Sequence, residues 1–113
     1  MRRSIKKMAI AVSLLLALPP VTLAAAGNPA AGQEKSLTCQ ACHGPDGHSI
    51  APNYPNLAGQ HESYLVQALR DYRSGKRSNA IMAGFAANLT DQDIDDLAAW
   101  FASQKGLLDL SVK

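Results

Sequence analysis

The sequence predicts an all-α fold, and three observations support this prediction. Three segments repeat apolar residues at helical spacing, two long loops separate them, the first of which is rich in glycine, proline and asparagine, and no stretch alternates in polarity as a strand would. The 113 residues are enough for one domain. Long loops are unusual in so small a domain unless they serve a function. We therefore expect the loops to carry functional residues.

The first predicted helix covers residues 29–38. Asn28 is a suitable N-cap, and Pro29 suits the first helical position because the amide hydrogen that it lacks would have no helical partner there. Gly32 lies inside this helix, where glycine costs ~1 kcal/mol relative to alanine. It either lets another helix approach closely or is a tolerated residue of a short helix.

The second predicted helix covers residues 62–74 and ends at Gly75, a residue type typical of helix C-termini. Its apolar positions form one stripe: Tyr64, Leu65, Ala68, Leu69 and Tyr72. A group of basic residues lies off this stripe or just beyond the helix: Arg70, Arg73, Lys76 and Arg77. This group is either a docking patch or an ordinary solvated face.

The third predicted helix covers residues 91–105. Thr90 and Asp93 match a capping box, and the acidic residues of the first turn complement the helix dipole. The apolar face consists of Ile94, Leu97, Ala98 and Phe101. The two loops between the predicted helices then cover residues 44–61 and 75–89.

The first 26 residues have the features of a secretory signal peptide. Basic residues at positions 2–7 precede an apolar run at 8–18 and small residues at 22–26. The apolar run is about half of the ~20 residues that a membrane-spanning helix needs. We expect cleavage after Ala24 or Ala26, which leaves residues 27–113 as an exported, periplasmic domain with no stable membrane span.

Cleavage would reverse the sign of the net charge. The chain has 11 lysines and arginines, of which four lie in the first 26 residues, whereas all 9 acidic residues lie beyond them. The mature domain therefore has a net charge of about −2, and it has no basic stripe of the kind that binds nucleic acid.

Residues 39–43 are Cys-Gln-Ala-Cys-His, the C-x-x-C-H signature of covalent c-type haem attachment. Two thiols one helical turn apart can reach the two vinyl groups on one edge of the porphyrin and become thioethers. The adjacent His43 then lies under the iron. The sequence therefore predicts one covalent haem c, attached at Cys39 and Cys42, with His43 as an iron ligand.

Other interpretations of the two cysteines are weaker. A thioredoxin-like pair opens a helix after a strand, whereas this motif closes a helix in a chain without a parallel-sheet pattern. A structural zinc site needs four ligands, and the chain has only two cysteines. A disulfide is common in exported proteins, but it would be strained across so short a loop.

Met82 is the single methionine after residue 26, and it lies in the predicted loop 75–89. We expect it to be the second axial iron ligand, and the alternative is an ordinary core or surface methionine. His48 and His61 could also bind iron, but we interpret both as solvated loop residues. A His/Met pair raises the reduction potential. It also fills both axial positions, which favours electron transfer over catalysis.

From about Ala30 to Lys105, the chain resembles class I c-type cytochromes. It is most similar to small soluble bacterial monohaem cytochromes and to single halves of dihaem periplasmic ones. The matching segments are residues 31–33, 39–47, 51–60, 64–65, 81–84 and 89–98. This resemblance implies three main helices with long loops wrapped around one covalently bound haem.

The resemblance also implies roles for individual residues. Cys39 and Cys42 hold the haem, and His43 and Met82 are the axial iron ligands. The Pro52 carbonyl accepts the other ring N–H of the axial histidine. The first and last helices cross, with Gly32 near Trp100 or Phe101. Further haem-pocket candidates are Tyr54, Leu57, Leu65 and Phe85, of which Phe85 stands where the family often has a second methionine and so removes a competing ligand.

The sequence thus predicts a single-electron carrier that is not an enzyme and that shuttles electrons between periplasmic or membrane redox proteins. One alternative is a haem c subunit of a larger dehydrogenase or oxidase complex. Another is a haem peroxidase or gas sensor, which would need an open sixth iron position. A last one is a thiol–disulfide oxidoreductase, which would need free thiols.

Overall fold

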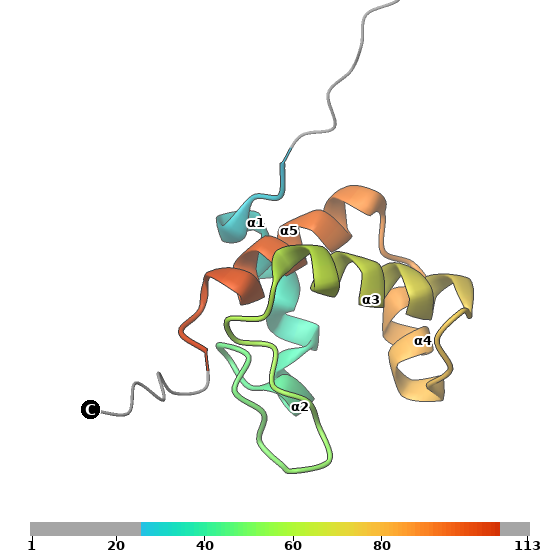
Figure 1. Cartoon of the computed structure of the whole chain (residues 1–113), viewed down its shortest axis with the longest axis horizontal. Helices are drawn as coiled ribbons and strands as arrows, with labels where there is room; N and C mark the ends of the chain where they lie inside the picture. The colour runs from blue at the N-terminus through green and yellow to red at the C-terminus, as the bar shows by residue number, and fades with distance from the viewer. Residues whose placement is uncertain (1–25, 107–113) are drawn as a thin grey trace, which may run out of the picture.

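A computed structural model describes residues 26–106 of the chain (Figure 1). Within this range it contains helices and no strand, as predicted. The helical elements are α1 (Pro29–Lys35), the 3₁₀ turn η1 (Ser36–Thr38), α2 (Gln40–His43), α3 (Glu62–Ser74), α4 (Ala80–Ala86) and α5 (Asp91–Ser103). None of the described helices is both long enough and apolar enough to cross a membrane. Residues 1–25, which make up nearly all of the predicted signal peptide, lie outside the described residues.

The first helical segment leads directly into the C-x-x-C-H motif. The side-chain oxygen of Asn28 accepts hydrogen bonds from the amides of Ala30 and Ala31 and so caps α1. The chain then continues through η1 into α2, which ends at His43. Gly44 stops α2 with a φ of +77°, a conformation that side-chain-bearing residues rarely adopt. The motif therefore lies on a helical turn with a defined end.

Helices α3 and α5 confirm two of the predicted helices. Helix α3 has the predicted bounds and ends at Gly75 with a φ of +79°. Helix α5 begins at the predicted capping box, in which the Asp93 amide donates to Thr90 Oγ1 at 3.1 Å and the Thr90 amide donates to Asp93 Oδ2 at 2.9 Å. It ends at Ser103, two residues before the predicted end.

The prediction that residues 75–89 form a loop is wrong, because helix α4 lies within this range. Asn79 caps this helix by accepting hydrogen bonds from the amides of Ile81 and Met82 at 3.1 and 3.0 Å. The helix has seven residues and contains Gly84, so it is too short and too poor in periodic signal to be recognised from apolar spacing. Met82 therefore lies in the first turn of a helix and not in a loop.

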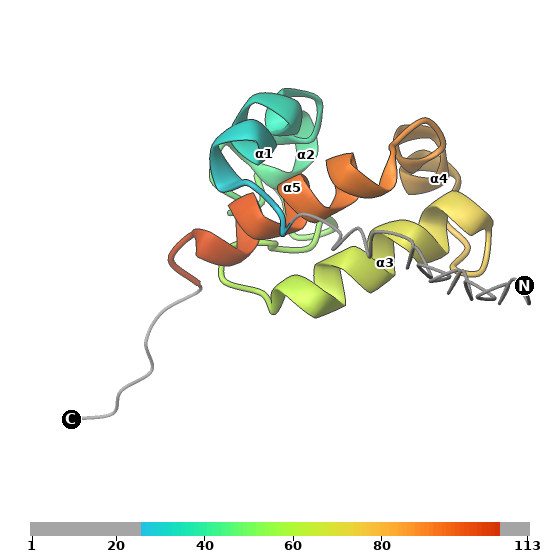
Figure 2. The ribbon, with the colours of Figure 1, turned by 90° about the horizontal axis from the view of Figure 1, so that it is seen from above.

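Helix α5 lies between α1 and α3 (Figure 2), and α4 packs against α3. The main cluster of buried apolar residues consists of Leu65, Leu97, Ala98 and Phe101, which come from α3 and α5. Where α1 crosses α5, a Cβ atom on Gly32 would lie 1.9 Å from the Asp96 carbonyl oxygen and 2.8 Å from Trp100 Cβ. The predicted crossing is thus present, and glycine is required there because the two backbones touch.

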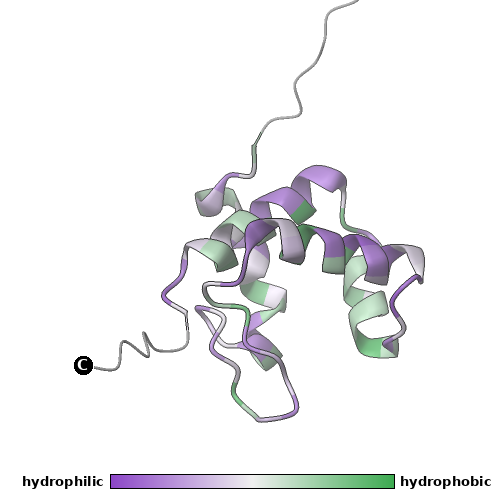
Figure 3. Cartoon of the chain, viewed as in Figure 1, coloured by the Kyte–Doolittle hydropathy of each residue, from purple (hydrophilic) through white to green (hydrophobic). Residues whose placement is uncertain are grey.

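Ion pairs bind both outer helices to α5. Lys35 of α1 contacts Asp93 and Asp96 at 2.8 and 2.6 Å. On the other side, Arg73 of α3 contacts Asp91 at 2.6 Å and Arg70 contacts Asp95 at 3.5 Å. Two members of the predicted basic group therefore join helices instead of forming a free patch. In Figure 3, α4 is coloured mostly as apolar, whereas α3 and α5 mix polar and apolar residues.

Candidate haem site

The described part of the chain contains a hollow of about 940 Å³, part of which is open to solvent, between α2, α3, α4 and α5. A second hollow adjoins it, and seven residues line both: Thr38, Cys39, His43, Pro55, Tyr72, Met82 and Phe85. In Figure 1, α2 and the loop 44–61 lie on one side, α4 lies on the other, and α3 lies above them. We refer to the two hollows together as the cavity.

His43 is buried and its ring orientation is fixed by the loop 44–61. Its Nδ1 lies 2.8 Å from the carbonyl oxygen of Pro55. Since a carbonyl oxygen can only accept, Nδ1 carries the hydrogen and Nε2 is the nitrogen that is free to bind a metal. Such a contact orients a ligating histidine and fixes its tautomer.

The prediction that Pro52 provides this carbonyl is wrong, because the structure places Pro55 there. Pro52 lies in an exposed turn and is not among the residues that line the cavity. Two hydrogen bonds hold the Pro55 region against the segment that follows the C-x-x-C-H motif. The Leu57 amide donates to the Gly47 carbonyl at 2.8 Å, and the Ser49 amide donates to Asn56 Oδ1 at 2.7 Å. The spacing of prolines in the sequence does not reveal these contacts.

The two cysteines are not joined in a disulfide, and both line the cavity. Burial raises the pKa of the Cys39 thiol, an effect that the neighbouring Cys42 reinforces and a hydrogen bond to Thr38 partly opposes. A redox-active C-x-x-C pair normally has a nucleophilic cysteine whose pKa is lowered. The environment of Cys39 therefore does not favour thiol–disulfide exchange.

Met82 lines the cavity from α4, on a different element from His43 in α2. The Asn79 cap fixes the first turn of α4 and hence the start of the helix that carries Met82. The other two histidines do not line the cavity. His48 pairs with Asp46 at 3.0 Å, and His61 is exposed at the start of α3. The structure thus brings together the two residues predicted as axial ligands and leaves out the alternatives.

The predicted pocket residues Tyr54, Leu57, Leu65 and Phe85 all line the cavity. Sequence reasoning did not assign several further lining residues to the pocket: Pro55, Ala68, Leu69, Tyr72, Arg77, Leu97, Ala98 and Phe101. Most of these belong to the apolar stripes of α3 and α5, so their apolar spacing was visible in the sequence but predicted burial in the core. The cavity and the core in fact share residues, since Leu65, Leu97, Ala98 and Phe101 belong to both.

The residues present fit a covalent haem. Two cysteine side chains lie next to a buried histidine with an available nitrogen, a methionine lines the same cavity from another helix, and the remaining walls are mainly apolar. Tyr64 and Phe85 are large apolar side chains that are half exposed, and both line the cavity. A flat apolar group bound there would cover part of their surface.

Residues 25–105 match the model of the cytochrome c family. The chain belongs to the cytochrome c family. Its helices, its cavity and its C-x-x-C-H motif have the arrangement of a class I c-type cytochrome, a group that carries covalent haem c with its iron.

Three relatives show how close this family member is to known proteins. It is 57% identical over 95 residues to cytochrome c4 of Pseudomonas aeruginosa, an alignment that covers 83% of this chain and 47% of the relative. It is 48% identical over 83 residues to cytochrome c-554(548) of Halomonas halodenitrificans, covering 71% of this chain and all of the relative. The crystal structure of reduced cytochrome c4 from Pseudomonas stutzeri superposes with a TM-score of 0.70 at 47% identity, covering 74% of this chain and 48% of that one.

The chain spans about half the length of the curated cytochrome c4 relatives that it matches. A more distant relative is the thiosulfate dehydrogenase electron acceptor of Stutzerimonas stutzeri, which is 44% identical over 73 residues. The fold and the cofactor class are therefore shared with these proteins.

Proposed function

We propose that this chain is a single-electron carrier that holds one haem c through Cys39 and Cys42, with His43 and Met82 as axial iron ligands. The observation that carries the proposal is that His43 and Met82 line one cavity from different helices, beside both cysteines. When bound, the haem supplies an iron that changes between its ferric and ferrous states by one electron.

The residues of the chain prepare this chemistry in three ways. The cysteine thiols fix the group covalently at the α2 side of the cavity. The Pro55 carbonyl holds the His43 ring by Nδ1 and leaves Nε2 free to bind the iron, and α4 would supply the Met82 sulfur. With His43 and Met82 both bound to the iron, a substrate or oxygen would find no open coordination site, so we infer that the chain is a carrier and not an enzyme.

The absorption spectrum of the mature protein tests this proposal. We expect a covalently held c-type haem after pyridine treatment, and in the oxidised protein a sulfur-to-iron band from Met82. The matched control is Cys39→Ser/Cys42→Ser, which should lose its haem on denaturation and extraction. Rapid carbon monoxide binding by the native reduced protein would instead favour a sensor or peroxidase, and two titratable thiols would favour an oxidoreductase.

We further propose that the mature protein is periplasmic and that its partners are other redox proteins. The basic start and apolar run of residues 1–26 support export, and covalent haem attachment takes place outside the cytoplasm. Mass spectrometry of protein from a periplasmic fraction tests both points. A mature N-terminus at residue 25 or 27 is expected, and an uncleaved chain in the cytoplasmic fraction would contradict export.

A bound subunit of a dehydrogenase complex is the second candidate, because a thiosulfate dehydrogenase electron acceptor is among the relatives. Size-exclusion chromatography of a native extract separates the two possibilities. A free carrier elutes at the size of the domain or of a small oligomer, whereas a subunit elutes together with the activity of the larger enzyme.

A further inference from the structure

Arg77 occupies an unusual position at the edge of the cavity. It lies in the connection between α3 and α4 and is one of the residues that line the cavity. Its guanidinium donates a hydrogen bond to the Tyr64 hydroxyl at 3.3 Å and lies 4.9 Å from the centre of the Tyr72 ring. Its amide donates to the Asp71 carbonyl at 3.0 Å. Backbone and side chain are thus both fixed on α3, and both tyrosines also line the cavity.

Three other basic side chains, on the cavity wall or on α3, already have carboxylate partners. Lys35, the second long basic side chain that lines the cavity, contacts both Asp93 and Asp96. Arg70 and Arg73 are paired with the acidic residues of α5. Among residues 26–106, Arg77 has no carboxylate within 4 Å. It is therefore the cation of the cavity wall that is free to bind an anion.

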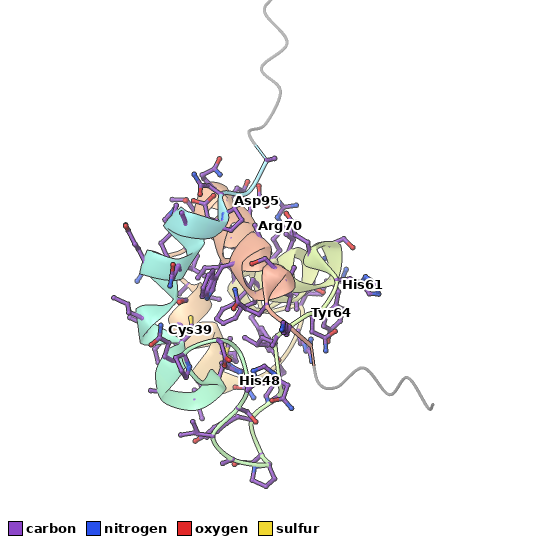
Figure 4. The ribbon with its side chains drawn as sticks, turned by 90° about the vertical axis from the view of Figure 1, so that its left-hand side faces the viewer. Cys39, His48, His61, Tyr64, Arg70 and Asp95 are labelled. Carbon is purple, nitrogen blue, oxygen red and sulfur yellow. The ribbon has the colours of Figure 1, made fainter. Side chains whose placement is uncertain are left out.

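Haem brings the anions that such a cation would bind. The porphyrin carries two carboxylates on the edge away from the two vinyl groups, and the vinyl groups react with the cysteines. Arg77 lines the first hollow together with Cys39, and Cys42 lines the second. Figure 4 shows Cys39 well separated from Tyr64, whose hydroxyl accepts the hydrogen bond from Arg77. The guanidinium is therefore held on the Tyr64 side of the cavity, apart from Cys39, where a haem carboxylate without a partner would lose hydration.

We propose that Arg77 binds a carboxylate of the haem at the rim of the cavity, and that Tyr64 and Tyr72 position its guanidinium for this contact. Guanidinium and carboxylate match in shape and form charge-assisted hydrogen bonds. The pair compensates a negative charge near the iron and so favours the ferrous state. The proposal rests on haem binding as proposed above, and it assigns Arg77 a role in setting the reduction potential.

The test compares Arg77→Gln with Lys76→Gln in the holoprotein. Both variants remove one positive charge from an exposed side chain, but Lys76 does not line the cavity. We expect the midpoint potential of Arg77→Gln to fall further than that of Lys76→Gln. The haem carboxylate bending band in the resonance Raman spectrum should shift in Arg77→Gln and stay in place in Lys76→Gln.

Two further variants probe the geometry. Arg77→Lys keeps the charge but loses the planar donor pair, so its Raman band should shift while most of the potential is retained. Tyr64→Phe removes the hydroxyl that accepts a hydrogen bond from Arg77. It should shift the midpoint potential and the Raman band less than Arg77→Gln does. Since the Raman band is measured on the isolated protein, it distinguishes a haem carboxylate from a carboxylate on a partner.

Equal potentials in Arg77→Gln and Lys76→Gln, together with an unmoved carboxylate band, would overturn the proposal. The pyridine spectrum of the wild-type protein keeps this failure separate from a failure of the proposed function. A normal covalent haem spectrum with no effect of Arg77 would leave the carrier function intact and remove only the role of Arg77.

Discussion

The two residues proposed as axial ligands are held in different ways. His43 is buried, and a hydrogen bond from its ring to the Pro55 carbonyl fixes it. Met82 is held through its helix, because the Asn79 side chain accepts from the amides of Ile81 and Met82. The histidine is thus oriented by a direct contact with its ring, whereas the methionine is placed by the capping of the helix backbone.

Replacing Met82 should open one iron position without unfolding the protein. In Met82→Ala we expect the sulfur-to-iron band to disappear, the midpoint potential to fall and the reduced protein to bind carbon monoxide, because a thioether ligand favours the ferrous state. Optical titration and carbon monoxide mixing measure these changes. Leu37→Ala is the control, since Leu37 is exposed and does not line the cavity. An unchanged spectrum in Met82→Ala would rule out Met82 as a ligand.

At the residue scale the sequence predicted most of the candidate site but not all of it. Cys39, Cys42 and His43 follow from one contiguous motif, and Met82 is the single methionine of the mature chain. The carbonyl acceptor was assigned to Pro52 instead of Pro55, because the loop contains several prolines and its shape depends on hydrogen bonds between distant residues. Arg77 was recognised only as part of a basic group, since spacing cannot show which cations already have partners.

The helices are joined by one close backbone contact and by ion pairs. Helix α1 reaches α5 at Gly32, and the Lys35 pairs with Asp93 and Asp96 lie beside this crossing. Asp96 is buried and also accepts hydrogen bonds from the Asn28 amide and the Gln92 side chain at 2.8 Å each. The first and last helices of the domain are therefore joined by the hydrogen bonds and ion pairs of Asp96, which lie next to the close contact at Gly32.

The Gly32→Ala variant should separate α1 from α5. Its new methyl group would meet the Asp96 carbonyl oxygen at 1.9 Å, so the backbones must move and we expect a loss of roughly 3 kcal/mol or more in unfolding free energy. Gly84→Ala in α4 is the matched control because its Cβ would meet no atom within 4 Å, and helix propensity favours alanine by ~1 kcal/mol. Urea unfolding monitored by circular dichroism measures both. Equal stability of the two variants would argue against the close crossing.

Acidification should weaken the same crossing. Hydrogen bonds from Lys35 and from Thr90 lower the pKa of Asp93 from 3.8 to about 2, and the pKa of Asp96 is lowered by Lys35 and by the Asn28 amide. A carboxylate whose pKa is lower in the folded state stabilises the fold above its unfolded pKa. This stabilisation is lost as the pH falls from about 4 towards 2.

Unfolding midpoints measured between pH 6 and pH 2.5 test this dependence. Asp93→Asn should be less stable than the wild type at pH 6, and the difference should shrink as the pH falls through this window. Glu34→Gln serves as the control because Glu34 is exposed and forms no ion pair within the described residues. A difference between Asp93→Asn and the wild type that does not change with pH would contradict the role of the Asp93 charge.

Helix α4 shows why element prediction from this sequence was incomplete. The longer helices α3 and α5 have 13 residues each and clear apolar stripes, so their starts were predicted correctly. Helix α4 has two turns and is held by the Asn79 cap and by packing against α3. Its stability comes from contacts outside its own sequence, which a periodicity argument does not include.

For the whole molecule, the core and the cavity form one continuous apolar interior. Leu65, Leu97, Ala98 and Phe101 make up the main buried cluster and also line the cavity. Aromatic residues are only 5% of the sequence, so the protein has few large side chains with which to fill this space. A bound haem would supply the missing apolar surface, as expected for a small domain that depends on its cofactor.

The haem-free protein should consequently be far less stable than the holoprotein. We expect purified Cys39→Ser/Cys42→Ser, after haem extraction, to lose helical circular dichroism and to bind hydrophobic dyes, because the cavity walls would be exposed to water. Holoprotein with Leu37→Ala should resemble the wild type in both measurements. A haem-free protein with native helicity and cooperative unfolding would show that the side chains alone complete the core.

The position of α4 has a consequence for how the protein opens. Among the helices of residues 26–106, α4 packs against α3, while α5 is enclosed between α1 and α3. Rupture of a bond between iron and the Met82 sulfur would therefore release one short helix and leave the other helices in place. Segments with few buried contacts open at the lowest free energy, so the amide hydrogens of α4 should exchange with solvent well before those of α5. If Met82 binds the iron, displacement of α4 would be the motion that opens the iron to an external ligand.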